Sequence, residues 1–123
     1  MTGASARTPA ERWTAVCPVA SLTPDRGVTA LVGGAAVAVF WLTGGAVRAL
    51  AAHDPFCGAN VLGRGLVGSA GEVSYVASPM YKQRFDLATG RCLDDPAVSV
   101  PVYRTRVVNG MLQVGAPVRS SPE

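Results

Sequence analysis

The segment VYRTRVVNGMLQV, residues 102–114, carries the strongest local folding signal in the chain. The runs 102–107, rich in β-branched residues, and 111–114, mostly apolar, flank Asn109-Gly110. Asn-Gly is the favoured pair for a type I′ turn, because both central residues of that turn need a positive φ. The segment therefore predicts a β-hairpin. Its alternation places Arg104 and Arg106 on one face, which we expect to be solvated.

Upstream of this hairpin, short apolar runs alternate with Gly, Pro and Asp residues that favour turns. Thr43-Gly44-Gly45 predicts a second tight hairpin connection, and helical periodicity is weak throughout. Residues 54–71 hold many glycines among isolated apolar residues, which is typical of an ordered, loop-rich lobe. Further strands are expected at 13–16, 28–32, 35–42, 47–51 and 72–77, and a loop over 78–84 leads into Phe85-Asp86-Leu87. The sequence thus predicts an all-β fold.

Composition restricts the class of protein and of site. At 123 residues, with 49% apolar and 15% charged residues, the chain predicts one folded domain and not a disordered protein. The cations are scattered and do not indicate nucleic-acid binding. One histidine and three cysteines exclude any site that needs two histidines or four thiolates from this chain. We expect a domain over 12–115 between a flexible lead-in, 1–11, and a flexible tail, 116–123.

Residues 27–47 carry no charge and are numerous enough to cross a bilayer. Gly33-Gly34 and Gly44-Gly45 divide them into pieces of strand length, which favours two or three buried strands instead. Residues 1–10 do not resemble a signal peptide, and three widely spaced cysteines cannot form a closed disulfide set. We therefore predict a cytoplasmic protein with no membrane segment.

Three motifs that suggest chemistry fit structural roles better. His53 beside Asp54 has no recognisable nucleophile setting, and adjacent strand residues point to opposite faces, so we expect a partly exposed structural histidine. Asp94-Asp95 precedes a proline and predicts a turn. Residues 63–68 have the spacing of a dinucleotide-binding motif but lack its βαβ context.

Two loops, in their order along the chain, resemble a Rieske domain. DPFCG at 54–58 is followed by SPMY at 78–81 and FDLATGRCL at 85–93. In the Rieske family a Cys-x-His loop and a Cys-x-x-His loop hold a [2Fe-2S] cluster, and Phe-Asp-x-x-Thr-Gly follows the second loop. The resemblance covers residues 13–114. It implies a Rieske-like fold of antiparallel sheets or a barrel, in which the loop-rich lobe occupies the place of the cluster lobe.

All four cluster-ligand positions carry other residues. The two cysteines of the family fall on Asp54 and Ser78, and the two histidines on Phe56 and Tyr81. A Rieske cluster takes two thiolates on one iron and two imidazoles on the other. We therefore expect no cofactor, no metal and no catalytic residue in this chain. The cysteines are expected to be structural thiols: Cys17, Cys57 and Cys92.

A narrower resemblance is to the small-subunit family of the bacterial NADH-dependent assimilatory nitrite reductases. DPF at 54–56, VLGRG at 61–65, SPMYKQ at 78–83 and GRCL at 90–93 carry it in combination. It implies an accessory subunit without redox chemistry of its own. The large-subunit partner would carry FAD, siroheme and an iron-sulfur cluster and reduce nitrite to ammonium. Met80, Lys82 and Arg64 are candidate contacts with that partner.

Two other functions stay open at this point: a Rieske-type ferredoxin or oxygenase component, and a stand-alone β-barrel binding module. Loss of a cluster would also remove a cross-link between the two loops. We expect Phe56 and Tyr81 to fill that space as a satellite core, packed against each other or against Met80 and Pro55. The alternatives are that both rings face solvent on mobile loops, or that they form an exposed anchor for the large subunit.

Overall fold

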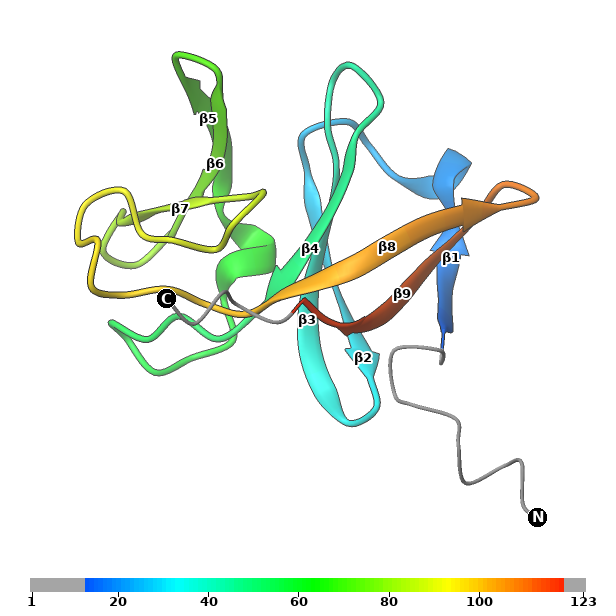
Figure 1. The fold of residues 1–123 in the computed structure, drawn as a ribbon, viewed down its shortest axis with the longest axis horizontal. Helices are drawn as coiled ribbons and strands as arrows, with labels where there is room; N and C mark the ends of the chain where they lie inside the picture. The colour runs from blue at the N-terminus through cyan, green and yellow to red at the C-terminus, as the bar shows by residue number, and fades with distance from the viewer. Residues whose placement is uncertain (1–12, 119–123) are drawn as a thin grey trace.

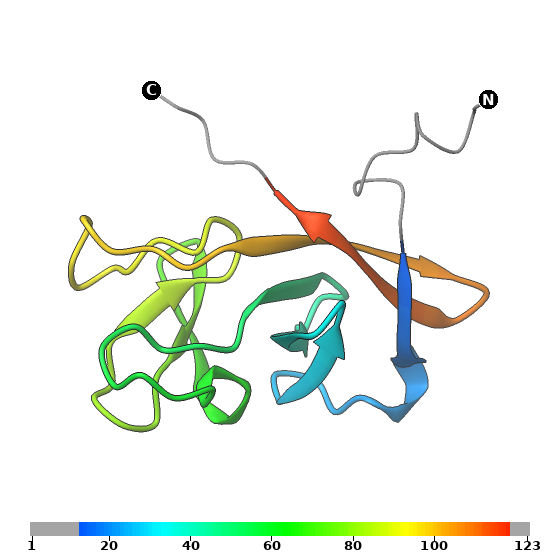
Figure 2. The same cartoon turned by 90° about the horizontal axis from the view of Figure 1, so that it is seen from below.

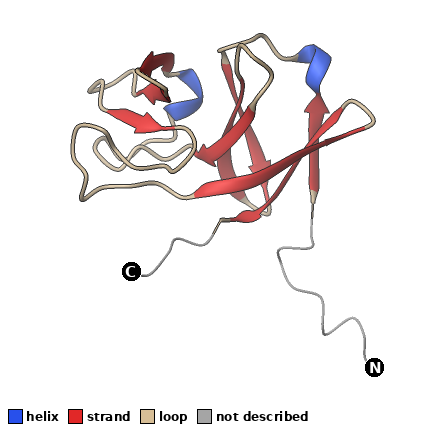
Figure 3. Ribbon diagram, turned by 45° about the horizontal axis from the view of Figure 1, so that its top comes forward, coloured by secondary structure: helices blue, strands red, loops and turns tan. Residues whose placement is uncertain are grey.

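The structure, a computed structural model, describes residues 13–118 as β-strands joined by turns, with two short 3-10 helices (Figures 1 and 3). The expected lead-in, 1–11, and the last five residues of the expected tail lie outside the described residues. Within this range the prediction of an all-β fold is confirmed. The strands are β1 (Thr14–Pro18), β2 (Gly27–Val32), β3 (Ala35–Trp41), β4 (Val47–Ala51), β5 (Leu66–Ala70), β6 (Val73–Ala77), β7 (Arg84–Asp86), β8 (Val102–Val108) and β9 (Met111–Pro117).

The strands form two antiparallel sheets. The large sheet has the order β1-β9-β8-β4-β3-β2, and the small sheet has the order β5-β6-β7. The small sheet and its loops lie at the end of the molecule away from β1 (Figures 1 and 2). The helix η3 (Val19–Ser21) follows β1, and η4 (Leu62–Arg64) connects the first loop to β5.

Of the two strands within the uncharged stretch, β3 is buried on both faces and β2 is partly exposed, so the expectation of two or three buried strands is wrong for β2. Val37 and Val39 point into a core enclosed by the large sheet, together with Leu112 and Val114 of β9. Its other face belongs to a second core. A strand buried on both faces needs a continuous apolar run and not an alternating one. No helix within residues 13–118 is long and apolar enough to cross a membrane.

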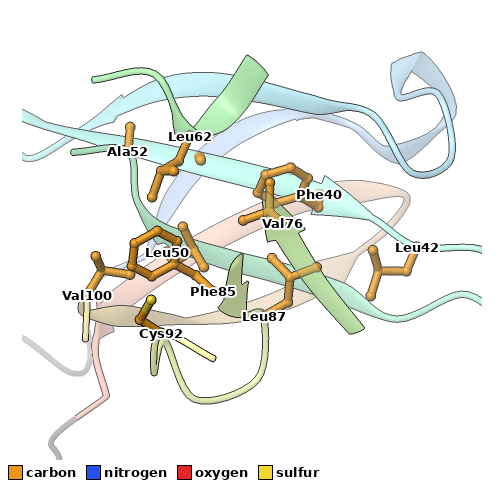
Figure 4. Packing of buried hydrophobic residues seen from close by; sticks show 11 residues of the cluster. Phe40, Leu42, Leu50, Ala52, Leu62, Val76, Phe85, Leu87, Cys92 and Val100 are labelled. Carbon is orange, nitrogen blue, oxygen red and sulfur yellow. The ribbon is translucent and has the colours of Figure 1, made fainter. Parts of the chain in front are cut away.

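The second core joins the two sheets (Figure 4). Phe40 and Leu50 of the large sheet meet Phe85 and Leu87, which belong to the FDLATG segment. Cys92 is fully buried in the same core as a free thiol. This packing fixes the small sheet against the large one. The remaining buried members of the cluster are Ala38, Leu42, Ala52, Leu62, Val76 and Val100.

The hairpin at residues 102–114 is confirmed. Asn109 and Gly110 both have positive φ, 52° and 79°, as a type I′ turn requires. Arg104 and Arg106 are exposed, but the Arg106 guanidinium also stacks over the Trp13 ring at 4.1 Å. Strand β9 continues to Pro117 and so includes the first two residues of the expected tail.

The loop-rich interpretation of residues 54–71 is wrong for its second half, which holds η4 and β5. Strand β5 lies at the edge of the small sheet, where Leu66 is exposed. It also contains Gly68, a residue that weakens strand signals. Gly68 pairs with Tyr75 of β6, and an added Cβ at Gly68 would lie 2.7 Å from the Tyr75 hydroxyl. The glycine therefore makes room for an aromatic ring across the pair.

Candidate functional site

The two loops singled out in the sequence meet at one buried hydrogen bond. The first loop follows β4 and the second follows β6. Asp54 and Ser78 are both buried, and the Ser78 hydroxyl donates to Asp54 Oδ2. The resemblance to the Rieske family implies that these two positions correspond to its two cysteines. A direct polar link thus joins the two loops that, by this resemblance, a cluster would join in a Rieske site.

Each loop is closed by the same backbone pattern. The Gly58 N–H donates to the Asp54 carbonyl at 2.8 Å, and the Lys82 N–H donates to the Ser78 carbonyl at 3.0 Å. Gly58 and Lys82 both have positive φ, 80° and 68°. The two loops are therefore matched turns, each starting at a residue of the Asp54–Ser78 pair.

Side-chain hydrogen bonds complete the network around this pair. Asp54 Oδ1 accepts the Phe56 N–H at 2.9 Å, and Ser78 Oγ accepts the Met80 N–H at 3.2 Å. A buried carboxylate is costly unless it is hydrogen-bonded, and Asp54 receives one N–H donor and one O–H donor. The network therefore holds the middle residue of each turn as well as its two ends.

The expected satellite core of Phe56 and Tyr81 is wrong for Tyr81. Phe56 is half-buried and joins the second core, with its ring centroid 6.1 Å from that of Phe85. Tyr81 is 59% exposed and Met80 is 55% exposed. The polar Asp54–Ser78 link occupies the junction between the loops, so the two rings are not needed to hold them.

The residues at the four ligand positions do not fit a [2Fe-2S] cluster. A carboxylate, a phenyl ring, a hydroxyl and an exposed phenol replace the two thiolates and two imidazoles. Both Asp54 oxygens already accept hydrogen bonds from the protein. Over residues 13–118, no three His, Cys, Asp or Glu side chains are grouped to hold a metal ion.

The structure separates the other candidate residues. His53 is exposed, and its Nδ1 lies 3.4 Å from Asn60 Oδ1, which agrees with a structural histidine. Met80 and Lys82 lie on the second loop and are exposed. Arg64, at the end of η4, instead lines an open groove with Asp25 and Arg26, and no residue of the two loops contributes to this groove.

The second loop is also held by a contact that the sequence does not predict. Arg84, directly after this loop, forms an ion pair with Asp94 at 2.8 Å and lies against the Tyr75 ring. The Arg84 side chain and then its backbone N–H lower the pKa of Asp94, and the hydrogen bond to Asp94 raises the pKa of Arg84. Asp94, expected as a turn residue, therefore also ties the end of this loop to the segment after Cys92.

The comparisons with known proteins cover nearly the whole chain. The family of Rieske-like [2Fe-2S] domains matches residues 12–115. The chain is 40% identical over 104 residues to the nitrite reductase (NADH) small subunit of Salmonella typhimurium, covering 84% of this chain and 96% of that one. It is 47% identical, with a TM-score of 0.83, to the crystal structure of a Mycobacterium tuberculosis protein assigned as an NADH-dependent nitrite reductase small subunit, covering 89% and 96%.

A third relative is a larger protein. Over 107 residues the chain is 38% identical to the nitrite reductase [NAD(P)H] large subunit of Klebsiella oxytoca, covering 87% of this chain but 11% of that subunit. A domain similar to this chain is therefore part of the large polypeptide in that organism.

Proposed function

Since this chain belongs to the Rieske-like [2Fe-2S] domain family, and within it to the nitrite reductase (NADH) small subunits, we propose that it is the accessory subunit of an NADH-dependent assimilatory nitrite reductase. It binds the large subunit in the cytoplasm and supports it without redox chemistry of its own. The large subunit carries FAD, siroheme and an iron-sulfur cluster and reduces nitrite to ammonium.

The Asp54–Ser78 link is the observation that carries the accessory role. It holds the two loops together by a hydrogen bond between side chains that stand at the thiolate positions. A Rieske-type electron carrier needs these positions for iron. The similarity to part of the Klebsiella large subunit supports the choice of partner.

Reconstitution tests this role. The purified large subunit is assayed for NADH-dependent nitrite reduction with and without one equivalent of this chain, and its thermal unfolding is followed in both samples. We expect the chain to have no activity alone and to change the rate, the nitrite affinity or the unfolding temperature of the large subunit. Equal values for all three quantities in both samples would contradict the accessory role.

The absence of redox chemistry is tested on the isolated chain. We expect an anaerobic preparation to be colourless and to contain neither stoichiometric iron nor acid-labile sulfide, because the loop residues offer no set of two thiolates and two imidazoles. Visible absorption and chemical analysis of both elements are the measurements. A cluster found in stoichiometric amount would favour the Rieske-type ferredoxin instead.

A further inference from the structure

We propose that the chain docks onto the large subunit through the tip of its two loops, a surface made of Pro55, Pro79, Met80, Tyr81 and Lys82. All five residues are exposed. This proposal rests on the proposed function and names the surface through which the chain binds the large subunit. It also gives the exposed Met80 and Tyr81 side chains of the second loop a role that the fold itself does not supply.

The tip is distinguished by which apolar residues it exposes. Met80 and Tyr81 are consecutive and more than half exposed, and neither belongs to either core. Leu31 and Leu66 are more exposed still, at 73% and 75%, but neither adjoins another exposed large apolar residue in sequence, and Val107-Val108 borders the hairpin turn. Single exposed apolar residues are normal in a folded protein. Tyr and Met are enriched at protein interfaces, whereas Val is under-represented among the residues that dominate binding energy.

The backbone beneath these side chains is fixed in advance. The Met80 N–H is held by Ser78 Oγ and the Lys82 N–H by the Ser78 carbonyl, and Ser78 is itself bonded to the buried Asp54. Two exposed apolar side chains on a closed turn lose less conformational entropy on binding than the same side chains on an open loop. The Asp54–Ser78 link therefore prepares the tip for docking.

The backbone conformation of Lys82 is a second, independent indication that the tip is a docking surface. Its φ of 68° lies in the left-handed region, which disfavours residues with a side chain. The matching position of the first loop is Gly58, which adopts this conformation at no steric cost. The chain thus keeps an exposed cation where a glycine would be easier to accommodate. Among the described residues, 13–118, the ion pair formed is Arg84–Asp94, and the Lys82 ammonium takes part in none.

The features of the tip define what its partner must offer. The partner surface has an apolar depression that takes Met80 and Tyr81 and a carboxylate that meets Lys82. The large subunit is the occupant we infer, because in the Klebsiella protein the matching domain and the large subunit share one polypeptide. In that arrangement the large subunit is always beside this domain.

The test compares binding of variants to the purified large subunit by calorimetry. We expect Tyr81→Ala and Met80→Ala each to weaken binding at least tenfold while the unfolding temperature of the free chain stays the same, because both side chains are exposed. Lys82→Gly is expected to weaken binding several-fold and to raise the unfolding temperature, because glycine relieves the left-handed φ. Leu31→Ala, an exposed apolar residue on β2, is the matched control and should bind like the wild type.

The possible outcomes distinguish a wrong docking surface from a wrong accessory function. If the wild-type chain binds and Tyr81→Ala binds equally well, the tip is not the docking surface, although the accessory role stands. If the wild-type chain does not bind the large subunit at all, the proposed function itself fails. Sedimentation of the free chain tests whether a second copy of the chain occupies the tip instead. If the chain self-associates, and Tyr81→Ala abolishes this self-association but leaves large-subunit binding unchanged, the tip is a contact between two copies.

Discussion

Asp54→Ala is expected to lower the free energy of unfolding by about 2–4 kcal/mol, because it leaves the buried Ser78 hydroxyl and the part-buried Phe56 N–H without their acceptor. Ser78→Ala removes one of the two donors of the buried carboxylate and should cost about 1–3 kcal/mol. The double variant is expected to lose less than the sum of the two, since the second change removes a group that the first has already left unpaired. Urea unfolding of the four proteins measures this coupling.

Asp25 provides a matched control at the surface. Its carboxylate accepts a backbone N–H at 2.8 Å and a hydroxyl at 2.5 Å, both from Thr43, so it has the same two kinds of donor as Asp54. The Thr43 hydroxyl and then the Thr43 N–H lower the pKa of Asp25. Because Asp25 is exposed, Asp25→Ala should cost clearly less than Asp54→Ala. Equal losses, or additive losses in the Asp54–Ser78 cycle, would mean that burial of the pair is not what holds the loops.

Much of the fold could be predicted because its signals are local. The type I′ turn at Asn109-Gly110 depends on the φ preferences of two adjacent residues, and the turn at 43–45 depends in the same way on Gly44 and Gly45, which both have positive φ. Strand β4 has the expected bounds, Val47–Ala51, because it lies between the turn residues Gly44-Gly45 and the Asp54-Pro55 pair that begins the first loop. Strand β5 was missed since its pattern depends on a partner: Gly68 has a structural role only opposite the Tyr75 ring.

The candidate site could be predicted in position but not in chemistry. The resemblance located Asp54 and Ser78 as equivalent positions of two loops, and the structure brings the two side chains together. The hydrogen bond between them was not predicted, because the two residues are 24 positions apart and nothing in either loop alone specifies the other. From the sequence alone, packing of Phe56 against Tyr81 is the contact that could hold the two loops together. The structure places Phe56 on Phe85 instead, a contact that depends on how the small sheet meets the large one.

Gly90→Ala is expected to cause the largest loss of any single substitution considered, about 4 kcal/mol or more, which is a large part of the stability of a small domain. Gly90 ends the FDLATG segment with a φ of 80°, and an added Cβ would lie 2.0 Å from the Val100 carbonyl oxygen. Neither side can move easily: the Gly90 N–H is bonded to the Asp86 carbonyl, and the Val100 N–H to the Gly90 carbonyl. Val100 and Phe85, next to Asp86, are both in the second core.

Gly71→Ala separates the two sources of this loss. Gly71 also has a positive φ, 62°, but an added Cβ there meets no atom within 4 Å. The control should therefore cost only the left-handed conformation of an alanine, about 1–2 kcal/mol. Urea unfolding measures the free energy of unfolding of both variants. If Gly90→Ala yields no folded protein, the circular dichroism spectrum of its refolded chain is compared with that of Gly71→Ala instead. Similar losses in the two variants would show that the φ at Gly90, and not its close approach to Val100, is why a glycine is needed there.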